Sequence, residues 1–537
     1  SPTTDNYPYV IDFRTDYYYI APQALERFCI PKNAFHKVME YHRDFVYGPD
    51  YAKLKAEFDD LLSTERCTHN MEYRWMDLKK RPVWIKCKGH LIRDAKMKPL
   101  YMIGCINEIG GKQKADNVSG LLGETGFREY ISNPVPTWKK GYLLRVGIDH
   151  FKEINEKFSM EYGDFILRET AACISSCMSE KQRVYKLMAD EFLILDVSSD
   201  DTKEAGKLFI KIRESIDQFV EENDFEVMYT ISGGSLALHS SENIEYSKVM
   251  KLTDFSLNEA KKRGRNRCYI FDEKDYSRFI RKGEITQELR EATRNGFQGF
   301  VAFYQPVIEA KSGRLSGAES LMRFSSSKFG MVSPVEFIPI LEETGLIIPV
   351  GRWMMKEAME KCSQIRKVIP GFKVNINISQ VQVSKSDVII DIADEMEKAG
   401  LSPEAMNIEL TESDLLEGDI NTQHFLKELK RMGIKLALDD FGTGYSNFHY
   451  LSELDPEIIK IDRSFTSSAV ADEKEYYLLK QFCRMIHNLG LKICIEGVEN
   501  QEEWAKIQKL EPDFGQGFFW GRPCGYDEFV RQFIEKK

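Results

Sequence analysis

Apolar and polar positions along the chain change their spacing twice, and each change predicts a new kind of domain. In the first 112 residues, strand-like runs at 67–75, 83–92 and 100–109 are separated by polar turns. Short helical patterns at 22–28 and 51–63 precede these runs. The order predicts a small α+β domain over residues 1–112 with an antiparallel meander.

Residues 113–272 carry a different pattern. Strands are expected at 142–148, 184–188, 192–197 and 227–237, and helices at 164–177, 203–222 and 249–262. The order strand, helix, two strands, helix, strand is that of a ferredoxin-like fold. In residues 273–297, apolar side chains recur among charges at a helical spacing, which predicts an amphipathic connecting helix rather than a flexible linker.

From residue 298 onward, strands and helices alternate. Strands are expected at 300–306, 314–322, 373–378, 406–410, 435–438, 458–461, 492–495 and 515–519. Eight strands in about 240 residues predict a (β/α)8 barrel, the TIM-barrel architecture. The first two strands are expected to form an antiparallel hairpin around 311–313.

Composition narrows the class of ligand. The net charge of −10 argues against binding DNA or RNA through a broad basic face, but leaves small anionic ligands open. None of the 11 cysteines falls in a CxxC pair, so neither a zinc cluster nor a disulfide framework is indicated. We expect a cytoplasmic protein. No apolar run is long enough to span a membrane, and because the first residue is Ser1, a membrane tether upstream stays open.

Polar residues end the predicted barrel strands one after another. They are Glu319, Asn377, Glu409, Asp439, Asp440, Lys460 and Glu496. Each alone would most often cap a helix or face solvent, but strand ends of such a barrel converge on one mouth. Several carboxylates crowded there without counter-charge would repel one another strongly, so divalent cations are their natural partners. Oxygen ligands without His or Cys favour Mg²⁺ or Mn²⁺.

The same residues carry a resemblance to EAL-domain cyclic di-GMP phosphodiesterases over 298–537. The matching motifs are Glu319-Ser320-Leu321, Asn377-Ile378-Ser379, Glu409-Leu410-Thr411-Glu412, Asp439-Asp440-Phe441-Gly442, Lys460-Ile461-Asp462, Glu496-Gly497-Val498-Glu499 and Gln516-Gly517. Ser320 stands where the family has Ala, which adds a hydroxyl but removes no ligand. The resemblance implies metal-dependent hydrolysis of cyclic di-GMP to linear pGpG, in a protein that forms homodimers.

The resemblance also assigns roles to residues. Two metal ions would be held by Glu319, Asn377, Glu409, Asp439, Asp440 and Glu496. Catalysis would involve Lys460, Glu496 and Glu319, with Lys460 orienting the attacking water. Substrate contacts are implied for Gln305, Arg323 and Gln516, and coupling of a loop to dimer packing for Glu412, Phe441 and Gly442. The alternative is a non-catalytic cyclic di-GMP receptor or signalling scaffold, although such receptors typically lack some of these residues.

Residues 113–272 resemble a GGDEF domain, the palm-type fold of diguanylate cyclases, in a degenerate form. The signature reads Met188-Ala189-Asp190-Glu191-Phe192, so two glycines that allow close approach to a phosphate are missing. Gly147 stands where the family has a metal-binding Asp. These departures imply a catalytically inactive domain with a regulatory role.

A remnant GTP pocket in this domain stays open against the alternative of inherited surface polarity. Asn155 and Asp164 match the guanine contacts of the family, and Lys261 and Arg265 match its phosphate contacts. The spacing of the two cations predicts that they share one helix face. GTP bound there would act as an allosteric ligand through the connecting helix.

Residues 1–112 resemble a PAS sensor domain, mainly through Glu72-Tyr73-Arg74-Trp75 and the strands that follow. The sequence does not indicate which signal or ligand it senses. We therefore expect a multidomain α/β and α+β protein. Its parts would be a PAS domain (1–112), a ferredoxin-like GGDEF domain (113–272), a connecting helix (273–297) and an EAL TIM-like barrel (298–537) with an antiparallel first strand.

Overall fold

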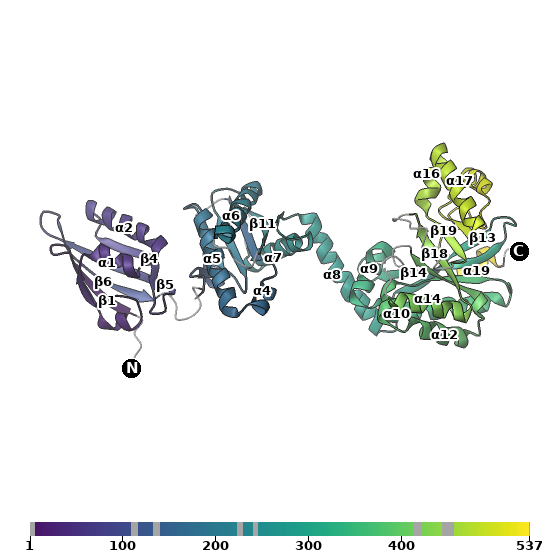
Figure 1. The fold of residues 1–537 in the computed structure, drawn as a ribbon, viewed down its shortest axis with the longest axis horizontal. Helices are drawn as coiled ribbons and strands as arrows, with labels where there is room; N and C mark the ends of the chain where they lie inside the picture. Colours follow the sequence, from purple (N-terminus) through teal and green to yellow (C-terminus); the bar gives the residue numbers. More distant parts are fainter. Residues whose placement is uncertain are drawn as a thin grey trace. The chain divides into compact units, whose positions relative to one another are not determined.

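The computed structural model describes residues 6–108, 116, 118–132, 140–222, 229–239, 245–411, 420–442 and 456–535 (Figure 1). The chain divides into two compact units, Ser1–Ser277 and Arg278–Lys537. The division falls within helix α8, Glu273–Arg294. Among the described residues, no helix is both long enough and apolar enough to cross a membrane.

The N-terminal part of the first unit is a six-stranded antiparallel sheet in the order β3-β2-β1-β6-β5-β4. The predicted meander is confirmed as β4 (Thr68–Met76), β5 (Pro82–Arg93) and β6 (Pro99–Glu108). The sequence did not predict the other half of the sheet, which consists of β1 (Asn6–Asp12), β2 (Tyr17–Ile20) and β3 (Ala34–His36). Helices α1 (Val38–Phe45) and α2 (Gly48–Ser63) follow β3, and the expected helix at 22–28 is a short 3-10 helix, Pro22–Glu26.

The core of this sheet domain is aromatic, and His42 lies within it. His42 on α1 is buried, and its ring centroid lies 5.0 Å from that of Tyr18 and 4.8 Å from that of Phe45. Its Nδ1 lies 2.7 Å from Val38 O. Burial lowers the pKa of His42 from 6.5 to about 4, and the hydrogen bond to Val38 opposes this only in part.

Stability of the domain is therefore expected to depend on pH through His42. The folded state favours the neutral ring, so the stabilisation is complete above pH 6.5. It is lost as the pH falls towards 4, by about 3 kcal/mol in total. Hydrogen exchange of the β4–β6 amides at pH 7 and pH 5, corrected for intrinsic rates, measures the change. A His42→Phe variant is expected to show a flatter response, and an equally steep response would contradict the role of His42.

The second part of the first unit has a six-stranded sheet in the order β12-β11-β8-β10-β9-β7. Its strands are β7 (Leu122–Gly123), β8 (Lys140–Ile148), β9 (Gln182–Lys186), β10 (Glu191–Asp196), β11 (Ile231–His239) and β12 (Cys268–Ile270). One face packs against α5 (Met160–Cys177) and α6 (Thr202–Glu222), and the other against α3 (Glu124–Ile131) and α7 (Tyr246–Lys262). A short helix, α4 (Phe151–Lys157), follows β8. The arrangement agrees with the predicted ferredoxin-like order.

One expectation for this domain is wrong. Lys261 and Arg265 do not share a helix face, because α7 ends at Lys262. Arg265 lies in the following turn with a φ of 56°, and its backbone N donates to Ala260 O. Gly264, with a φ of 109°, ends the helix in the way that glycine commonly does.

The second unit contains an eight-stranded mixed barrel in the order β14-β16-β17-β18-β19-β20-β21-β13, closed by the β13–β14 pairing. The strands are β13 (Phe300–Glu309), β14 (Leu315–Ser326), β16 (Lys373–Asn377), β17 (Met406–Thr411), β18 (Lys435–Phe441), β19 (Ile458–Ile461), β20 (Lys492–Ile495) and β21 (Phe514–Gly515). As predicted, β13 runs antiparallel to β14, and it is also antiparallel to β21. The other barrel neighbours are parallel.

Helices cover the outside of this barrel, and two short strands extend its sheet. The helices are α9 (Pro334–Thr344), α10 (Ile347–Arg366), α11 (Gln380–Lys385), α12 (Val388–Ala399), α14 (Ile420–Met432), α16 (Arg463–Ala471), α17 (Glu473–Asn488), α18 (Gln501–Ile507) and α19 (Tyr526–Phe533). The strands β15 (Gly330–Val332) and β22 (Cys524–Gly525) were not predicted. The part of α8 that belongs to this unit buries Ile285 and Leu289 in a cluster with Phe337 of α9. Arg281 adds two hydrogen bonds to Glu336, at 2.6 and 3.0 Å.

Candidate functional site

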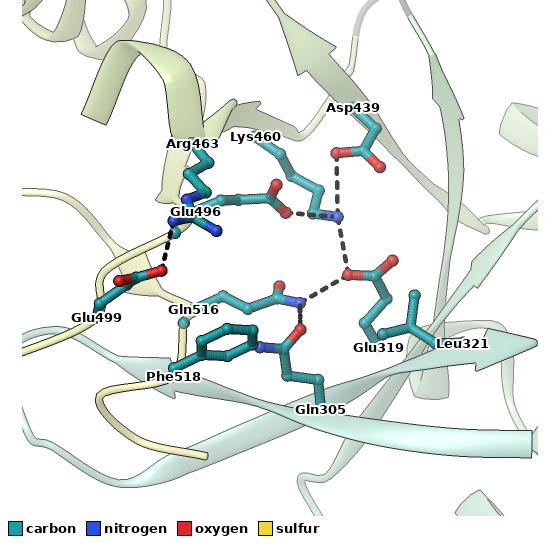
Figure 2. A pocket seen from close by; sticks show the side chains of 12 residues that line it. Gln305, Glu319, Leu321, Asp439, Lys460, Arg463, Glu496, Glu499, Gln516 and Phe518 are labelled. Atoms are coloured by element: carbon teal, nitrogen blue, oxygen red, sulfur yellow. Dashed lines mark hydrogen bonds and ion pairs between the residues drawn. The ribbon is translucent and has the colours of Figure 1, made fainter. Parts of the chain in front are cut away.

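The polar residues predicted at the strand ends do meet at one mouth of the barrel, around a pocket of roughly 260 Å³ (Figure 2). Parallel register explains the convergence, since Asn377 pairs with Glu409 and Thr411 with Asp439 across neighbouring strands. The lining residues are Gln305, Glu319, Leu321, Asp439, Lys460, Arg463, Glu496, Gly497, Glu499, Gln516, Gly517 and Phe518.

Lys460 lies at the centre of the acidic residues. Its Nζ is 2.8 Å from Glu496, 2.9 Å from Glu409, 3.1 Å from Asp439 and 3.2 Å from Glu319. The Lys460 side chain is only 1% exposed, so a single buried ammonium faces four carboxylates. Figure 2 shows three of these contacts, those with Asp439, Glu496 and Glu319.

Amide side chains orient Glu319 from the other side. Asn377 Nδ2 donates to Glu319 Oε1 at 2.8 Å, and Gln516 Nε2 donates to Glu319 Oε2 at 2.7 Å. Gln516 Nε2 also lies 3.1 Å from Gln305 Oε1 (Figure 2). Both oxygens of Glu319 are thus held by donors on three different strands or loops.

Burial and crowding move the pKa values of these carboxyl groups apart. Burial raises the pKa of Glu496 to about 8, with Lys460 opposing the rise and Asp439 adding to it. Burial and the nearby charge of Glu319 raise the pKa of Glu409 well above its usual range. For Glu319, burial is outweighed by Lys460 and by the amides of Gln516 and Asn377, so its pKa is lowered.

The donor set fits hard divalent cations. Glu319, Glu409 and Asp439 each offer an oxygen within 4.8 Å of the others, and so do Asp439, Asp440 and Glu496. Asp439 belongs to both groups, so two cations held there would share it. These groups contain only carboxylates, which Mg²⁺ and Mn²⁺ prefer over softer ligands. In this structure the Lys460 ammonium supplies positive charge among the carboxylates, as bound metal cations would.

Some predicted site residues lie away from this cluster. Arg323 Nη1 donates to Met322 O at 2.8 Å, and its guanidinium stands 5.6 Å from the Phe303 ring centroid. Arg323 is not among the described residues that line the pocket. Phe441 and Gly442 border a separate, mainly apolar pocket of roughly 230 Å³ beside α16 and α17. Glu412 lies outside the described residues.

The sequence analysis gave no role to several residues of the pocket, although Gly497 and Glu499 belong to one of its motifs. Arg463 and Glu499 form an ion pair of 2.5 Å at its rim, and Phe518 also lines the pocket (Figure 2). Arg463 comes just after β19 and Glu499 shortly after β20, so the strand-end rule that found their neighbours could have found both. Gly497, with a φ of 71°, is required here because a Cβ would lie 2.3 Å from Arg463 Cγ.

In the ferredoxin-like domain, the carboxylates close to Gly147 are engaged in hydrogen bonds and an ion pair, and a lysine stands beside Gly147. A Cβ added to Gly147 would lie 3.2 Å from Lys261 Nζ. Asp149 accepts hydrogen bonds from the Thr230 and Ser232 hydroxyls, both at 2.8 Å, and Glu191 is paired with Arg145 at 2.5 Å.

The predicted GTP-binding residues of this domain stand in two places. Asn155 packs against Gly163, because a Cβ added to Gly163 would lie 1.8 Å from Asn155 Oδ1. Asp164 is the next residue along the chain, so Asn155 and Asp164 belong to the same place. Asp164 and Arg265 are exposed, and Lys261 is half-buried beside Gly147. In the signature turn, Ala189 adopts a φ of 52°, which a glycine would adopt without strain. Whether these residues bind a nucleotide stays a prediction.

Comparison with known protein families gives three matches along the chain. The EAL domain matches residues 286–523, the domain described as diguanylate cyclase, GGDEF domain, matches 113–267, and the PAS fold matches 18–106. The matches follow the order of the structural domains.

Two curated relatives are similar to this chain over about three quarters of its length. MucR of Pseudomonas aeruginosa, described as a bifunctional diguanylate cyclase/cyclic di-GMP phosphodiesterase, is 29% identical over 414 residues, which are 76% of this chain and 59% of MucR. The cyclic di-GMP phosphodiesterase PdeR of Escherichia coli is 26% identical over 429 residues, 78% of this chain and 64% of PdeR. The chain therefore spans about three fifths of the length of these relatives.

A solved structure described as PaMucR phosphodiesterase, c-di-GMP complex, is also similar. It is 29% identical, covers 46% of this chain and 99% of its own, and superposes with a TM-score of 0.44. The three family matches place all three domains on one chain in a single order. The chain is therefore a PAS–GGDEF–EAL tandem protein of the diguanylate cyclase and cyclic di-GMP phosphodiesterase family.

Proposed function

We propose that the barrel is a metal-dependent phosphodiesterase that hydrolyses cyclic di-GMP to linear pGpG. The observation that carries the proposal is the mouth of the barrel, where four carboxylates surround one buried lysine and a fifth, Asp440, stands next to them. Relatives described as cyclic di-GMP phosphodiesterases support the choice of substrate.

Two groups of ligands would hold the cations. Glu319, Glu409 and Asp439 form the first, and Asp439, Asp440 and Glu496 the second, with Asn377 contributing beside Glu319. Bound Mg²⁺ or Mn²⁺ would supply a nucleophile at neutral pH and offset the charge of the phosphodiester. With cations neutralising the carboxylates, the Lys460 ammonium would be free to hold and orient the attacking water.

The reaction inserts one water molecule. The water oxygen forms a bond to phosphorus, the bond from phosphorus to one 3′-oxygen breaks, and that oxygen takes up a proton. Gln305 and Gln516 present amides at the pocket, where they would bind the substrate. Arg323 would have to turn away from Met322 O to reach a phosphate, and it would then bind as a planar fork.

The GGDEF domain is proposed to be an inactive regulator that binds GTP. Gly147 offers no carboxylate to a metal, and the Lys261 ammonium beside it opposes cation binding at the cyclase centre. A nucleotide could still use Asn155 and Asp164 to bind its base.

We also propose that the chain forms a cytoplasmic homodimer, consistent with exposed Phe465 and Leu478 beside Phe441 and Gly442. Light scattering after gel filtration measures the mass of the protein in solution, and a mass of two chains would support the homodimer.

One assay tests the proposal. Purified protein is incubated with cyclic di-GMP and Mg²⁺ or Mn²⁺, with and without GTP, and the nucleotides are separated. We expect pGpG to form only with metal, and faster with GTP. The Glu319→Ala variant provides the background rate.

The outcomes separate the alternatives. Tight binding of cyclic di-GMP with no pGpG above the Glu319→Ala background would favour the non-catalytic receptor. Appearance of cyclic di-GMP from GTP alone would show that the GGDEF domain is an active cyclase. If calorimetry detects no GTP binding, the regulatory proposal fails while the hydrolase stands.

A further inference from the structure

Directly beneath the acidic residues, the barrel interior holds two buried amide side chains. Asn375 on β16 and Asn407 on β17 pair in the parallel register, two residues before Asn377 and Glu409, so they form the next inward layer. They are 8% and 4% exposed. Interior layers of such barrels are usually filled by Val, Ile and Leu. Buried amides need hydrogen-bond partners, because an unsatisfied one costs about 1–3 kcal/mol.

The two amides form a chain that ends on Glu409. Asn407 Nδ2 donates to Asn375 Oδ1 at 2.8 Å, and Asn375 Nδ2 donates to Glu409 Oε1 at 2.6 Å. The other oxygen of Glu409, Oε2, accepts from Lys460 at 2.9 Å. Asn407 also fixes the orientation of the Asn375 amide. If that amide rotated by half a turn, its carbonyl would face Glu409, and the hydrogen bonds of Asn375 to Glu409 and to Asn407 would both be lost.

The far end of the chain opens on a small polar cavity. Asn407 Oδ1 has no hydrogen-bond partner among the described residues. Asn407 borders a cavity of roughly 30 Å³ that is also lined by Lys373, Glu457 and Lys460. A space of that size with polar walls has room for about one water molecule. Such a water would satisfy Asn407 Oδ1 and complete the chain.

We propose that Asn375 and Asn407 are positioning residues that aim Glu409 at the cation site. The inference rests on the proposed function of the barrel. Asn375 holds Oε1, so Oε2 faces the space that Lys460 Nζ fills in this structure. Partners that orient metal ligands in this way typically contribute 10- to 100-fold to metal affinity.

The test replaces the whole layer by apolar side chains of similar shape. Mn²⁺ binding to the full-length Asn375→Leu/Asn407→Leu variant is measured by calorimetry, together with its thermal unfolding in EDTA. We expect Mn²⁺ affinity to fall about 10- to 100-fold, and unfolding in EDTA reports separately the cost of leaving Glu409 Oε1 without its donor. A purely structural pair would lower stability and leave affinity unchanged.

Ser320→Ala is the matched control. Its hydroxyl donates to Asn375 O at 2.8 Å, so the variant removes a hydrogen bond from the same residue without touching the amide chain. Mn²⁺ affinity is expected to stay within about twofold of wild type. If the double variant does not fold, the single Asn407→Leu variant decides, with an expected loss of up to about tenfold.

Two results would overturn the inference in distinguishable ways. Wild-type affinity for Mn²⁺ in the folded double variant, or in Asn407→Leu where that variant decides, would refute the positioning role and leave the proposed function intact. Absence of Mn²⁺ binding to wild-type protein would refute the metal site itself, and the positioning role with it.

Discussion

Replacing Lys460 by methionine is expected to destabilise the metal-free barrel by about 3–5 kcal/mol. The substitution leaves Glu319, Glu409, Asp439 and Glu496 facing one another without the ammonium that lies within 3.2 Å of each. Divalent cations can replace the lost positive charge, so added Mn²⁺ is expected to raise the unfolding temperature more in the variant than in wild type. Hydrolysis is expected to fall about 10²- to 10⁴-fold, because a group that positions the attacking water is gone.

The measurement is thermal unfolding in EDTA and in Mn²⁺, followed by the hydrolysis assay. Lys492→Met is a suitable control, since Lys492 is half exposed and paired with Glu457 at 3.1 Å on the surface. Its loss is expected to cost under about 1 kcal/mol. A Lys460→Met protein as stable as wild type in EDTA would show that the carboxylates do not depend on that charge.

Glu319→Gln is expected to lower cyclic di-GMP hydrolysis at least about 10³-fold, which corresponds to about 4 kcal/mol of transition-state stabilisation. The variant keeps the size of the side chain but removes one ligand charge. It also turns an NH₂ group towards Asn377 Nδ2 or Gln516 Nε2, both of which are donors. The variant therefore loses both a ligand charge and the hydrogen-bond complementarity of this side chain.

Steady-state kinetics with saturating Mn²⁺ checks the result. Glu360→Gln, an exposed position on α10 in the same domain, controls for the change of charge and is expected to leave the rate within about twofold. A Glu319→Gln enzyme within tenfold of wild type would remove Glu319 from the ligand set.

Most of the candidate site could be predicted because barrels place functional residues at strand ends. The rule needs only strand positions, and Glu409 and Glu496 were found in this way. It could not find Asn375 and Asn407, which lie inside the strands. Their signal was weaker: polar residues at alternate positions in Lys373–Asn377 and Met406–Thr411, sharing the inward face with Asn377 and Glu409.

The fold was less predictable where local rules conflict with tertiary structure. Pro8 lies within β1, and proline usually argues against an interior strand, yet β1 pairs with both β2 and β6. Arg265 was placed on a helix by its spacing from Lys261, but Gly264 ends that helix first. The position of Arg323 depends on side-chain packing against Phe303, which spacing does not describe.

The reversed direction of β13 decides on which side the upstream chain joins the barrel. Strand β14 is parallel to β16, so its C-terminal end points to the mouth, and Phe300, the first residue of β13, pairs with Phe324 near that end. Gln305, which lines the pocket, follows only five residues later, about 17 Å along the strand. In an all-parallel barrel the first strand would begin at the opposite face. Here, a displacement of α8 would reach the pocket at the barrel mouth through a single strand, without crossing the barrel.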